Sequence, residues 1–100
     1  MLNINKKLEN GIAIFALQGR LDTMTAPDLE REIKESLTGI TSLTFDFTEL
    51  EYISSAGLRV LLSAQKVMNG QGEMKVCHVN ETIMEIFEVT GFSDILTIEE

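Results

Sequence analysis

The chain has 100 residues, 44% of them hydrophobic and 24% charged, a size and composition that predict one globular domain over residues 1–100. Its formal net charge of −8 disfavours binding to nucleic acid phosphates and to anionic membranes. No apolar stretch reaches the ~18 residues of a membrane span, and the first ten residues lack a signal-peptide pattern. We therefore expect a cytoplasmic protein, monomeric when alone, with no nucleic acid and no membrane as a partner.

The first part of the chain predicts a hairpin. Residues 2–8 place apolar side chains mostly at even positions, which is the period of a half-buried strand. Asn10 and Gly11 then suit a tight turn, because both residue types tolerate the positive φ that such turns require. The returning run 12–17 is apolar at every position, which predicts a central strand covered on both faces, with the first strand beside it.

A helix and a third strand are predicted next. Thr25 offers a capping hydroxyl, and Pro27 suits the first turn of a helix that ends near Gly39. Apolar residues then recur at spacings of four, at Leu29, Ile33 and Leu37. Residues 43–48 alternate between apolar and polar side chains, as in a strand. The helix that separates this strand from the previous one suits a parallel crossover.

A second helix and a fourth strand follow. The helix begins at Ser54 or Ser55, has a broad apolar face and is stopped by the turn residues 69–72. Residues 74–79 are again mostly apolar and predict the fourth strand.

The end of the chain predicts one more helix and strand. Asn80 is suited to cap the helix and Gly91 to end it, and residues 95–98 form a short last strand. The predicted order is β-β-α-β-α-β-α-β. This order predicts an α/β fold in which a mixed, mostly parallel β-sheet packs against α-helices.

The sequence offers little for catalysis. His78 is the only histidine, and the chain has neither a G-x-S-x-G elbow nor either of the common glycine-rich phosphate loops. Cys77 is the only cysteine, so a disulfide framework or a Cys-based metal site is not expected within the chain. We therefore predict a protein that is not an enzyme and that has no catalytic residue, cofactor or metal site.

Polar residues near the ends of two strands predict a binding site. Asp22 follows the second strand, Asp46 lies within the third, and Ser54 and Ser55 follow the third. In a right-handed parallel crossover these segments open on the same edge of the sheet, so the four residues are expected to share one neighbourhood. The alternatives are a turn-forming role for Asp22 and an ordinary surface position for Asp46.

Ser54 and Ser55 have two possible roles. One of them caps the second helix, because a serine oxygen there accepts a hydrogen bond from a free backbone N–H. A phosphoryl group at this place is also favoured by the N–H groups and by the positive end of the helix dipole. Phosphorylation would take the net charge from −8 to about −10.

The same residues carry a resemblance to a known family. Residues 47–62, Phe-Thr-Glu-Leu-Glu-Tyr-Ile-Ser-Ser-Ala-Gly-Leu-Arg-Val-Leu-Leu, resemble the signature of bacterial anti-sigma factor antagonists, also called anti-anti-sigma factors, which are built as a lone STAS domain. Residues 19–22, Gly-Arg-Leu-Asp, resemble the family's G-x-L-D loop. Residues 43–46 and 89–92 resemble its third strand and the end of its last helix. Order and spacing agree over essentially the whole chain.

The resemblance implies a partner-switching phosphoprotein in transcription regulation. In the family, the unphosphorylated antagonist binds an anti-sigma factor that is also a serine kinase and so releases the sigma factor. Phosphorylation by that kinase abolishes binding, and a PP2C-type phosphatase reverses it. Aligning Gly57 and Leu58 with the family's Gly-Leu places the phosphoacceptor at Ser55. Many members have an acid where this chain has Ser54, so Ser54 remains the alternative acceptor.

The resemblance and the residues together predict a docking surface. It consists of the loop from residue 19 to residue 24, the segment 52–55 and the start of the second helix. Four residues are expected to supply apolar contacts, and the acids Asp22 and Asp46 are expected to position the acceptor hydroxyl or the partner. The predicted partner-binding residues are Arg20, Leu21, Asp22, Met24, Asp46, Tyr52, Ile53, Ser54, Ala56, Gly57 and Arg59. The apolar contacts among them are Leu21, Met24, Tyr52 and Ile53.

Two other functions suit the same sequence. One is a non-switching STAS accessory subunit of a lipid-transport ABC system, in which Ser55 is only a helix cap or a residue that contacts the partner. The other is a STAS switch that acts on an output other than a sigma factor.

Overall fold

The computed structural model describes residues 2–99, and its elements follow the predicted order with one added short helix. The strands are β1 (Leu2–Glu9), β2 (Ile12–Leu21), β3 (Ser42–Ile53), β4 (Glu73–Cys77) and β5 (Ile98–Glu99). The helices are α1 (Ala26–Ser36), α2 (Ser55–Asn69), α3 (Glu81–Thr90) and α4 (Phe92–Ile95).

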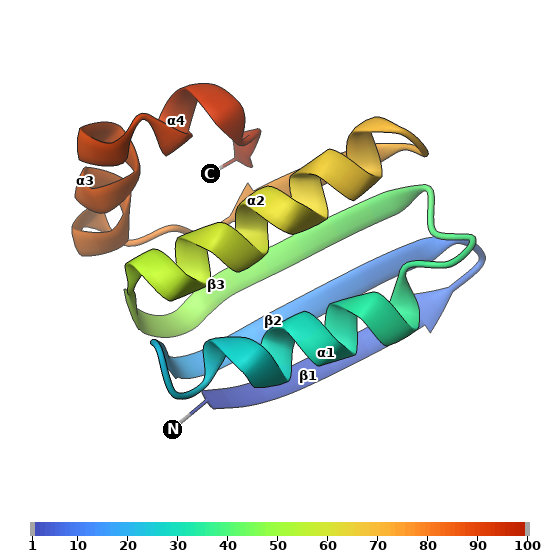
Figure 1. The fold of residues 1–100 in the computed structure, drawn as a ribbon, viewed down its shortest axis with the longest axis horizontal. Coiled ribbons are helices and arrows are strands. Elements are labelled where there is room, and N and C mark those ends of the chain that lie inside the picture. The colour runs from blue at the N-terminus through green and yellow to red at the C-terminus, as the bar shows by residue number, and fades with distance from the viewer. Residues whose placement is uncertain (1, 100) are drawn as a thin grey trace.

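The strands form one mixed sheet in the order β1-β2-β3-β4-β5. β1 runs antiparallel to β2, and every other neighbouring pair is parallel (Figure 1). The predicted hairpin turn is confirmed, with φ of 49° at Asn10 and 81° at Gly11. The mostly parallel α/β architecture is confirmed as well.

Within residues 2–99, helices cover one face of the sheet and leave the other uncovered. α1 and α2 lie side by side across the same face (Figure 1). Ala13, Phe15 and Leu17 of β2 are buried beneath them, whereas Ile12 and Ile14 are 46% and 39% exposed on the other face. The prediction that β2 is covered on both faces is therefore wrong. A hydrophobic run does not show that a second layer of helices exists to cover it.

A chain of aromatic rings connects the sheet to the last helices. The ring centroids of Phe15 and Phe45 are 5.7 Å apart, and those of Phe45 and Phe47 are 6.4 Å apart. Phe87 of α3 continues the row at 6.4 Å from Phe47. All four rings are fully buried, so they hold α3 to the same core that α1 and α2 cover.

The C-terminal segment differs in part from the prediction. Asn80 caps α3 by accepting a hydrogen bond from the Ile83 amide at 2.8 Å, as expected. Ile95, however, ends the helix α4 instead of starting a strand, and β5 is only Ile98–Glu99. Leu96 is still buried, so its hydrophobicity reflects a place in the core and not in the sheet.

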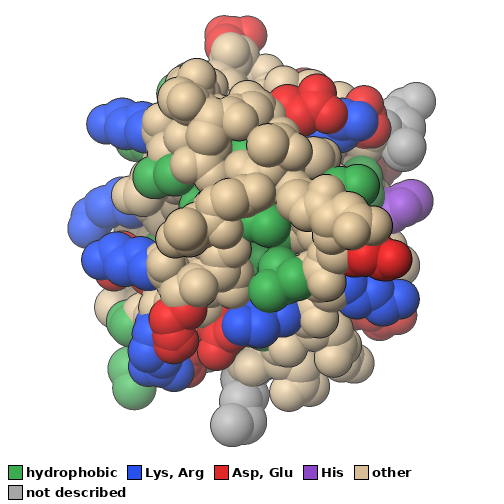
Figure 2. Space-filling model, turned by 90° about the vertical axis from the view of Figure 1, so that its right-hand side faces the viewer, with side chains coloured by type: hydrophobic (Ala, Val, Ile, Leu, Met, Phe, Trp, Pro, Cys, Tyr) green, Lys and Arg blue, Asp and Glu red, His purple; other side chains and the backbone are tan. Residues whose placement is uncertain are grey.

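Charges of both signs are mixed on one face of the protein surface. On the face shown in Figure 2, basic side chains lie beside acidic ones, so the net negative charge is not gathered into one patch there. No helix in the described part of the chain has both the length and the apolar character needed to span a bilayer.

Candidate functional site

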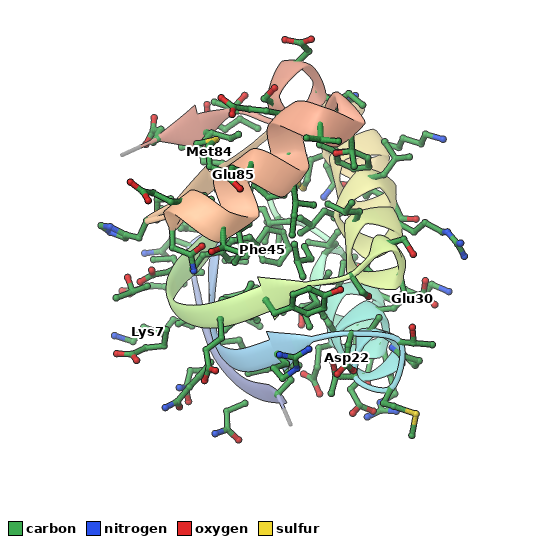
Figure 3. The ribbon with its side chains drawn as sticks, turned by 90° about the vertical axis from the view of Figure 1, so that its left-hand side faces the viewer. Lys7, Asp22, Glu30, Phe45, Met84 and Glu85 are labelled. Carbon is green, nitrogen blue, oxygen red and sulfur yellow. The ribbon has the colours of Figure 1, made fainter. Side chains whose placement is uncertain are left out.

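The site forms where β2 and β3 end and α2 begins. The Ser54 amide donates to the Leu21 carbonyl at 2.8 Å, which places the loop after β2 directly beside the start of α2. Figure 3 looks onto this end of the molecule, with Asp22 in the loop that leads from β2 into α1. The prediction that Asp22 and the two serines share one neighbourhood is therefore confirmed.

Asp22 builds the loop. Its carboxylate accepts hydrogen bonds from the Met24 amide at 3.0 Å and the Thr25 amide at 3.1 Å, and its carbonyl accepts from the Ala26 amide at 2.8 Å. Partial desolvation alone would raise the pKa of the Asp22 carboxyl, but these hydrogen bonds and the charge of Arg20 lower it on balance. Asp22 therefore has the turn-forming role that the sequence left as an alternative.

Thr25 does not cap α1 with its hydroxyl, which corrects the prediction. The buried hydroxyl instead donates to the Arg20 carbonyl at 2.9 Å and accepts from the Asp22 amide at 2.9 Å. It ties the end of β2 to the start of α1. At the beginning of α1, the Ala26 amide donates to the carbonyl of Asp22, four residues earlier, and the Asp28 amide donates to the Thr25 carbonyl.

The two serines differ in their environments. Ser54 is the N-cap of α2, and its hydroxyl oxygen accepts a hydrogen bond from the Gly57 amide at 3.4 Å. Ser55 is the first residue of the helix and is exposed. One hydroxyl therefore has a structural role, while the other faces solvent at the positive end of a 15-residue helix.

This difference predicts unequal effects of removing the two hydroxyls. Ser54→Ala is expected to lower the free energy of unfolding by about 0.5 to 1 kcal/mol, because it removes a long capping bond. Ser55→Ala should change it by less than about 0.5 kcal/mol, since an exposed hydroxyl is lost. Urea unfolding followed by circular dichroism measures both. Equal losses would contradict the division of roles between the serines.

An aromatic and two charged side chains line the exposed side of the strand ends. The guanidinium of Arg20 lies 4.5 Å from the ring centroid of Tyr52, a cation–π distance, and 4.0 Å from the Asp22 carboxylate. Met24 is 84% exposed at the tip of the loop. Met24 is thus a large apolar side chain that is almost fully exposed, on the loop that begins at Asp22.

Three predicted partner-binding residues, Leu21, Ile53 and Gly57, are buried and not available to a partner, which corrects the prediction for each of them. Leu21 and Ile53 are 0% and 1% exposed, because both point into the core beneath the start of α2. The buried Gly57 packs against their side chains. The prediction that Leu21 and Ile53 supply apolar contacts is therefore wrong: they support the surface from below.

A shallow groove lies between the first turns of α1 and α2, beside the loop that follows β2. Its walls include Ala56 and Arg59 of α2 and three residues from the loop and α1, Thr23, Pro27 and Glu30. Arg59 is exposed and lies four residues after Ser55, a spacing that puts both on one side of the helix. Ala56 and Arg59 thus keep the surface position that was predicted for them.

Asp46 lies apart from the serines, which corrects the predicted single neighbourhood. It sits midway along β3, opposite Cys77 of β4, and its carboxylate accepts from the Thr48 hydroxyl at 2.5 Å and amide at 3.0 Å. Burial alone would raise the pKa of Asp46, but these bonds and His78 lower it on balance. Burial raises the pKa of the Cys77 thiol.

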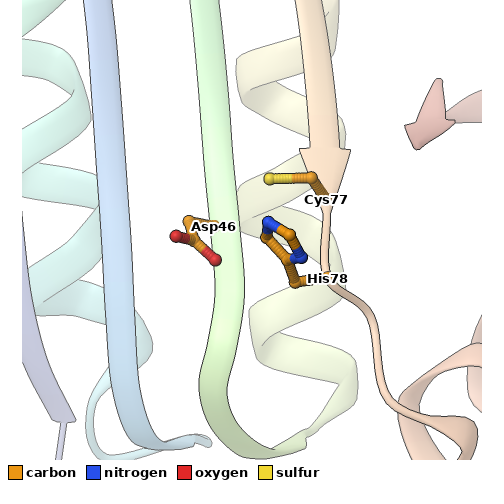
Figure 4. Close-up of side chains that lie close together, drawn as sticks. All are labelled: Asp46, Cys77 and His78. Atoms are coloured by element: carbon orange, nitrogen blue, oxygen red, sulfur yellow. The ribbon is translucent and has the colours of Figure 1, made fainter. Parts of the chain in front are cut away.

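Asp46, Cys77 and His78 form a cluster that the sequence did not predict. One donor atom from each lies within 4.8 Å of the others (Figure 4). Counting cysteines and histidines could not find this cluster, because its members come from β3, from the end of β4 and from the residue that follows β4. The register that pairs residue 46 with residue 77 was the missing information.

Comparisons with known proteins agree on one family. The STAS domain family model matches residues 3–100. BtrV of Bordetella bronchiseptica is 37% identical over 91 residues, which cover 89% of this chain and 78% of BtrV. The anti-sigma-B factor antagonist of Listeria monocytogenes is 33% identical over 101 residues, covering 98% of this chain and 87% of that protein.

A solved structure has the same fold. The phosphorylated form of SpoIIAA, a Bacillus cell fate determinant, matches with a TM-score of 0.76 over 98% of this chain and 92% of that one. The sequence identity is 15%, so this likeness is one of fold.

Proposed function

Because this chain belongs to the STAS domain family, we propose that it is an anti-sigma factor antagonist controlled by phosphorylation of Ser55. In this proposal the unphosphorylated protein binds an anti-sigma factor that is also a serine kinase, and the sigma factor is released. The kinase phosphorylates Ser55 and binding ends, until a PP2C-type phosphatase removes the phosphoryl group.

The observation that carries the proposal is the exposed hydroxyl of Ser55 at the start of α2. A kinase can reach this hydroxyl without unfolding the helix. The Ser54 hydroxyl is occupied by the Gly57 amide, which supports Ser55 over Ser54 as the acceptor. The 33% identity to a protein named an anti-sigma-B factor antagonist supports the choice of partner class.

The docking surface in this proposal surrounds Ser55. Met24 provides an exposed apolar contact, and the Arg20–Tyr52 cation–π pair provides an aromatic and a cationic one. Ala56 and Arg59 line the groove on the other side of the hydroxyl. Asp22 acts through the shape of the loop that presents Met24.

A phosphoryl group on Ser55 can change binding without changing the fold. The free N–H groups and the dipole at the start of α2 favour the added charge locally. At the interface, however, the same group brings a charge of about −1.5 to −2 that must lose its water when the partner docks. Each ~1.4 kcal/mol of that cost weakens binding tenfold.

The test is a pull-down from a lysate of the bacterium that encodes the chain, with bound proteins and phosphorylated sites identified by mass spectrometry. Wild type and Ser55→Ala are expected to retain a serine kinase of the anti-sigma type. Ser55→Asp should bind that kinase at least tenfold more weakly, measured by titration with the purified kinase.

Ser63→Asp is the matched control. Ser63 is exposed on the same helix, eight residues further along, so the variant adds the same charge away from the proposed interface. It should bind the kinase like wild type. Equal kinase binding by Ser55→Asp and wild type would overturn the proposal. So would capture of the same transporter ATPase by every variant with Ser55 never phosphorylated, which is the outcome expected of an accessory subunit.

A further inference from the structure

We propose that Asp46, Cys77 and His78 form a binding site for a divalent transition-metal ion of the Zn²⁺ type. The three side chains supply a carboxylate oxygen, a thiolate sulfur and an imidazole nitrogen, and their donor atoms lie within 4.8 Å of one another. In Figure 4 the Cys77 and His78 side chains extend from the end of β4 toward Asp46, which lies over β3. This site is independent of Ser55 and of the proposed switch.

The strand register brings two of the ligands together. Asp46 and Cys77 are Cα partners in the parallel ladder of β3 and β4, and Cys77 is in turn the partner of Glu99 in β5. Phe45 and Val76, their chain neighbours, are fully buried on the helix side. Since side chains alternate along a strand, Asp46 and Cys77 both lie on the face of the sheet that the helices leave uncovered.

His78 joins them through an unusual backbone conformation. A residue that simply continued β4 would point to the face opposite Cys77. His78 instead has φ of 58°, in the left-handed region that non-glycine residues rarely adopt. This turn ends β4 and leaves the imidazole close to the Cys77 sulfur and the Asp46 carboxylate.

The donor set selects the class of ion. A thiolate together with an imidazole favours borderline or soft ions such as Zn²⁺, whereas Mg²⁺ and Ca²⁺ prefer oxygen ligands only. Bond lengths of about 2.0 to 2.3 Å around a tetrahedral Zn²⁺ place its ligand atoms roughly 3.4 to 3.6 Å apart. Donor atoms within 4.8 Å of one another therefore have to approach by at most about 1.3 Å to reach these separations. The exposed His78 side chain can rotate toward the ion, and Asp46 and Cys77 have to close any remaining gap between their own donor atoms.

The residues around the cluster hold one of its ligands in place and shield two of them partly from solvent. Asp46 and Cys77 are half-buried, and the hydrogen bonds from Thr48 hold the Asp46 carboxylate in place, as groups behind a metal ligand usually do. Lys75 lies on the same face of β4, but Glu73 and Glu99 pair with it at 3.9 and 3.7 Å. Three protein ligands leave one tetrahedral position to water.

The experiment titrates the reduced, folded chain with Co²⁺ and then displaces Co²⁺ with Zn²⁺. One equivalent of Co²⁺ is expected to give a sulfur-to-cobalt charge-transfer band and the visible bands of tetrahedral cobalt, and Zn²⁺ should abolish both. Cys77→Ser should lose the charge-transfer band. Asp46→Asn and His78→Asn should each weaken Zn²⁺ binding at least about tenfold in calorimetry.

The variants are chosen to keep the fold, which circular dichroism checks. Asparagine tolerates the left-handed conformation at position 78, and at position 46 it keeps an oxygen that accepts from Thr48. Glu51→Gln, an exposed acid further along β3, is the control and should bind Zn²⁺ like wild type. The proposal is overturned if the folded wild type gives no cobalt–thiolate band, or if Asp46→Asn and His78→Asn bind Zn²⁺ as tightly as wild type.

Discussion

Replacing Gly72 with alanine is expected to lower the free energy of unfolding by at least about 3 kcal/mol, which in a domain of this size corresponds to a fall in Tm of roughly 12 °C or more. A Cβ on Gly72 would lie 1.9 Å from the Thr41 carbonyl oxygen and 2.5 Å from its carbonyl carbon. Both are backbone atoms, so no side-chain rotation relieves the overlap.

Thr41 has little freedom to move away. Its carbonyl accepts a hydrogen bond from the Glu73 amide at 3.0 Å, where β4 begins. Its own amide donates to the Gly11 carbonyl at 2.8 Å, in the turn between β1 and β2. Shifting Thr41 would therefore disturb the loops at which β2, β3 and β4 meet.

Gly70→Ala is the matched control, only two residues earlier in the same turn. A Cβ there would meet nothing closer than the Val67 carbonyl oxygen at 3.6 Å, and Gly70 has helical backbone angles. This variant should be neutral or more stable by up to about 1 kcal/mol, because alanine restricts the unfolded chain. Thermal unfolding measures the Tm of both variants and of wild type. Equal stability of Gly72→Ala and wild type would show that the close approach to Thr41 is unimportant.

The pattern of side chains along the chain predicts most of this fold. The alternation in β3, the four-residue spacing in α1 and the Asn10-Gly11 turn each depend on neighbouring residues, and all are present in the structure. The strand β1 is present too, but its burial alternates only as far as Ile4, and Leu8 is 50% exposed. The run 12–17 is an exception, because the prediction that both faces of this strand are covered is wrong. Its uniform hydrophobicity does not reveal whether one or two layers of helices will cover the strand.

For the candidate site, the sequence predicts which segments meet but not which of their side chains are exposed. That Asp22 lies beside Ser54 follows from the topology of parallel strands alone. That Leu21 and Ile53 are buried depends on which face of the sheet α2 covers, which the chain order does not determine. The meeting of Asp46 with Cys77 and His78 depends on the register that pairs residue 46 of β3 with residue 77 of β4, and on one left-handed residue. Local patterns contain neither piece of information.

Gly57→Ala is expected to destabilise the domain by about 2 to 3 kcal/mol and to weaken binding of the proposed kinase. A Cβ at position 57 would lie 2.7 Å from Cγ of Leu21 and 2.8 Å from Cγ1 of Ile53. Both atoms are bonded directly to Cβ of a fully buried side chain, so neither can move aside without disturbing the core. The first turn of α2 must then lift from the sheet and carry Ser55 with it.

The sign of the effect separates this explanation from helix propensity. Within a helix, glycine to alanine ordinarily stabilises by about 1 kcal/mol, so destabilisation at Gly57 requires the steric contact with the core. A double-mutant cycle identifies that contact. Leu21→Ala alone should cost about 2 to 5 kcal/mol, but it removes two of the three close atoms.

The double variant Gly57→Ala with Leu21→Ala should therefore be more stable than the sum of the single effects predicts, by about 1 kcal/mol or more. Additive losses would mean that the strain lies elsewhere. The same cycle measured on kinase binding tests whether the buried pair sets the position of Ser55. Because neither residue is exposed, any coupling in affinity must act through the placement of the start of α2.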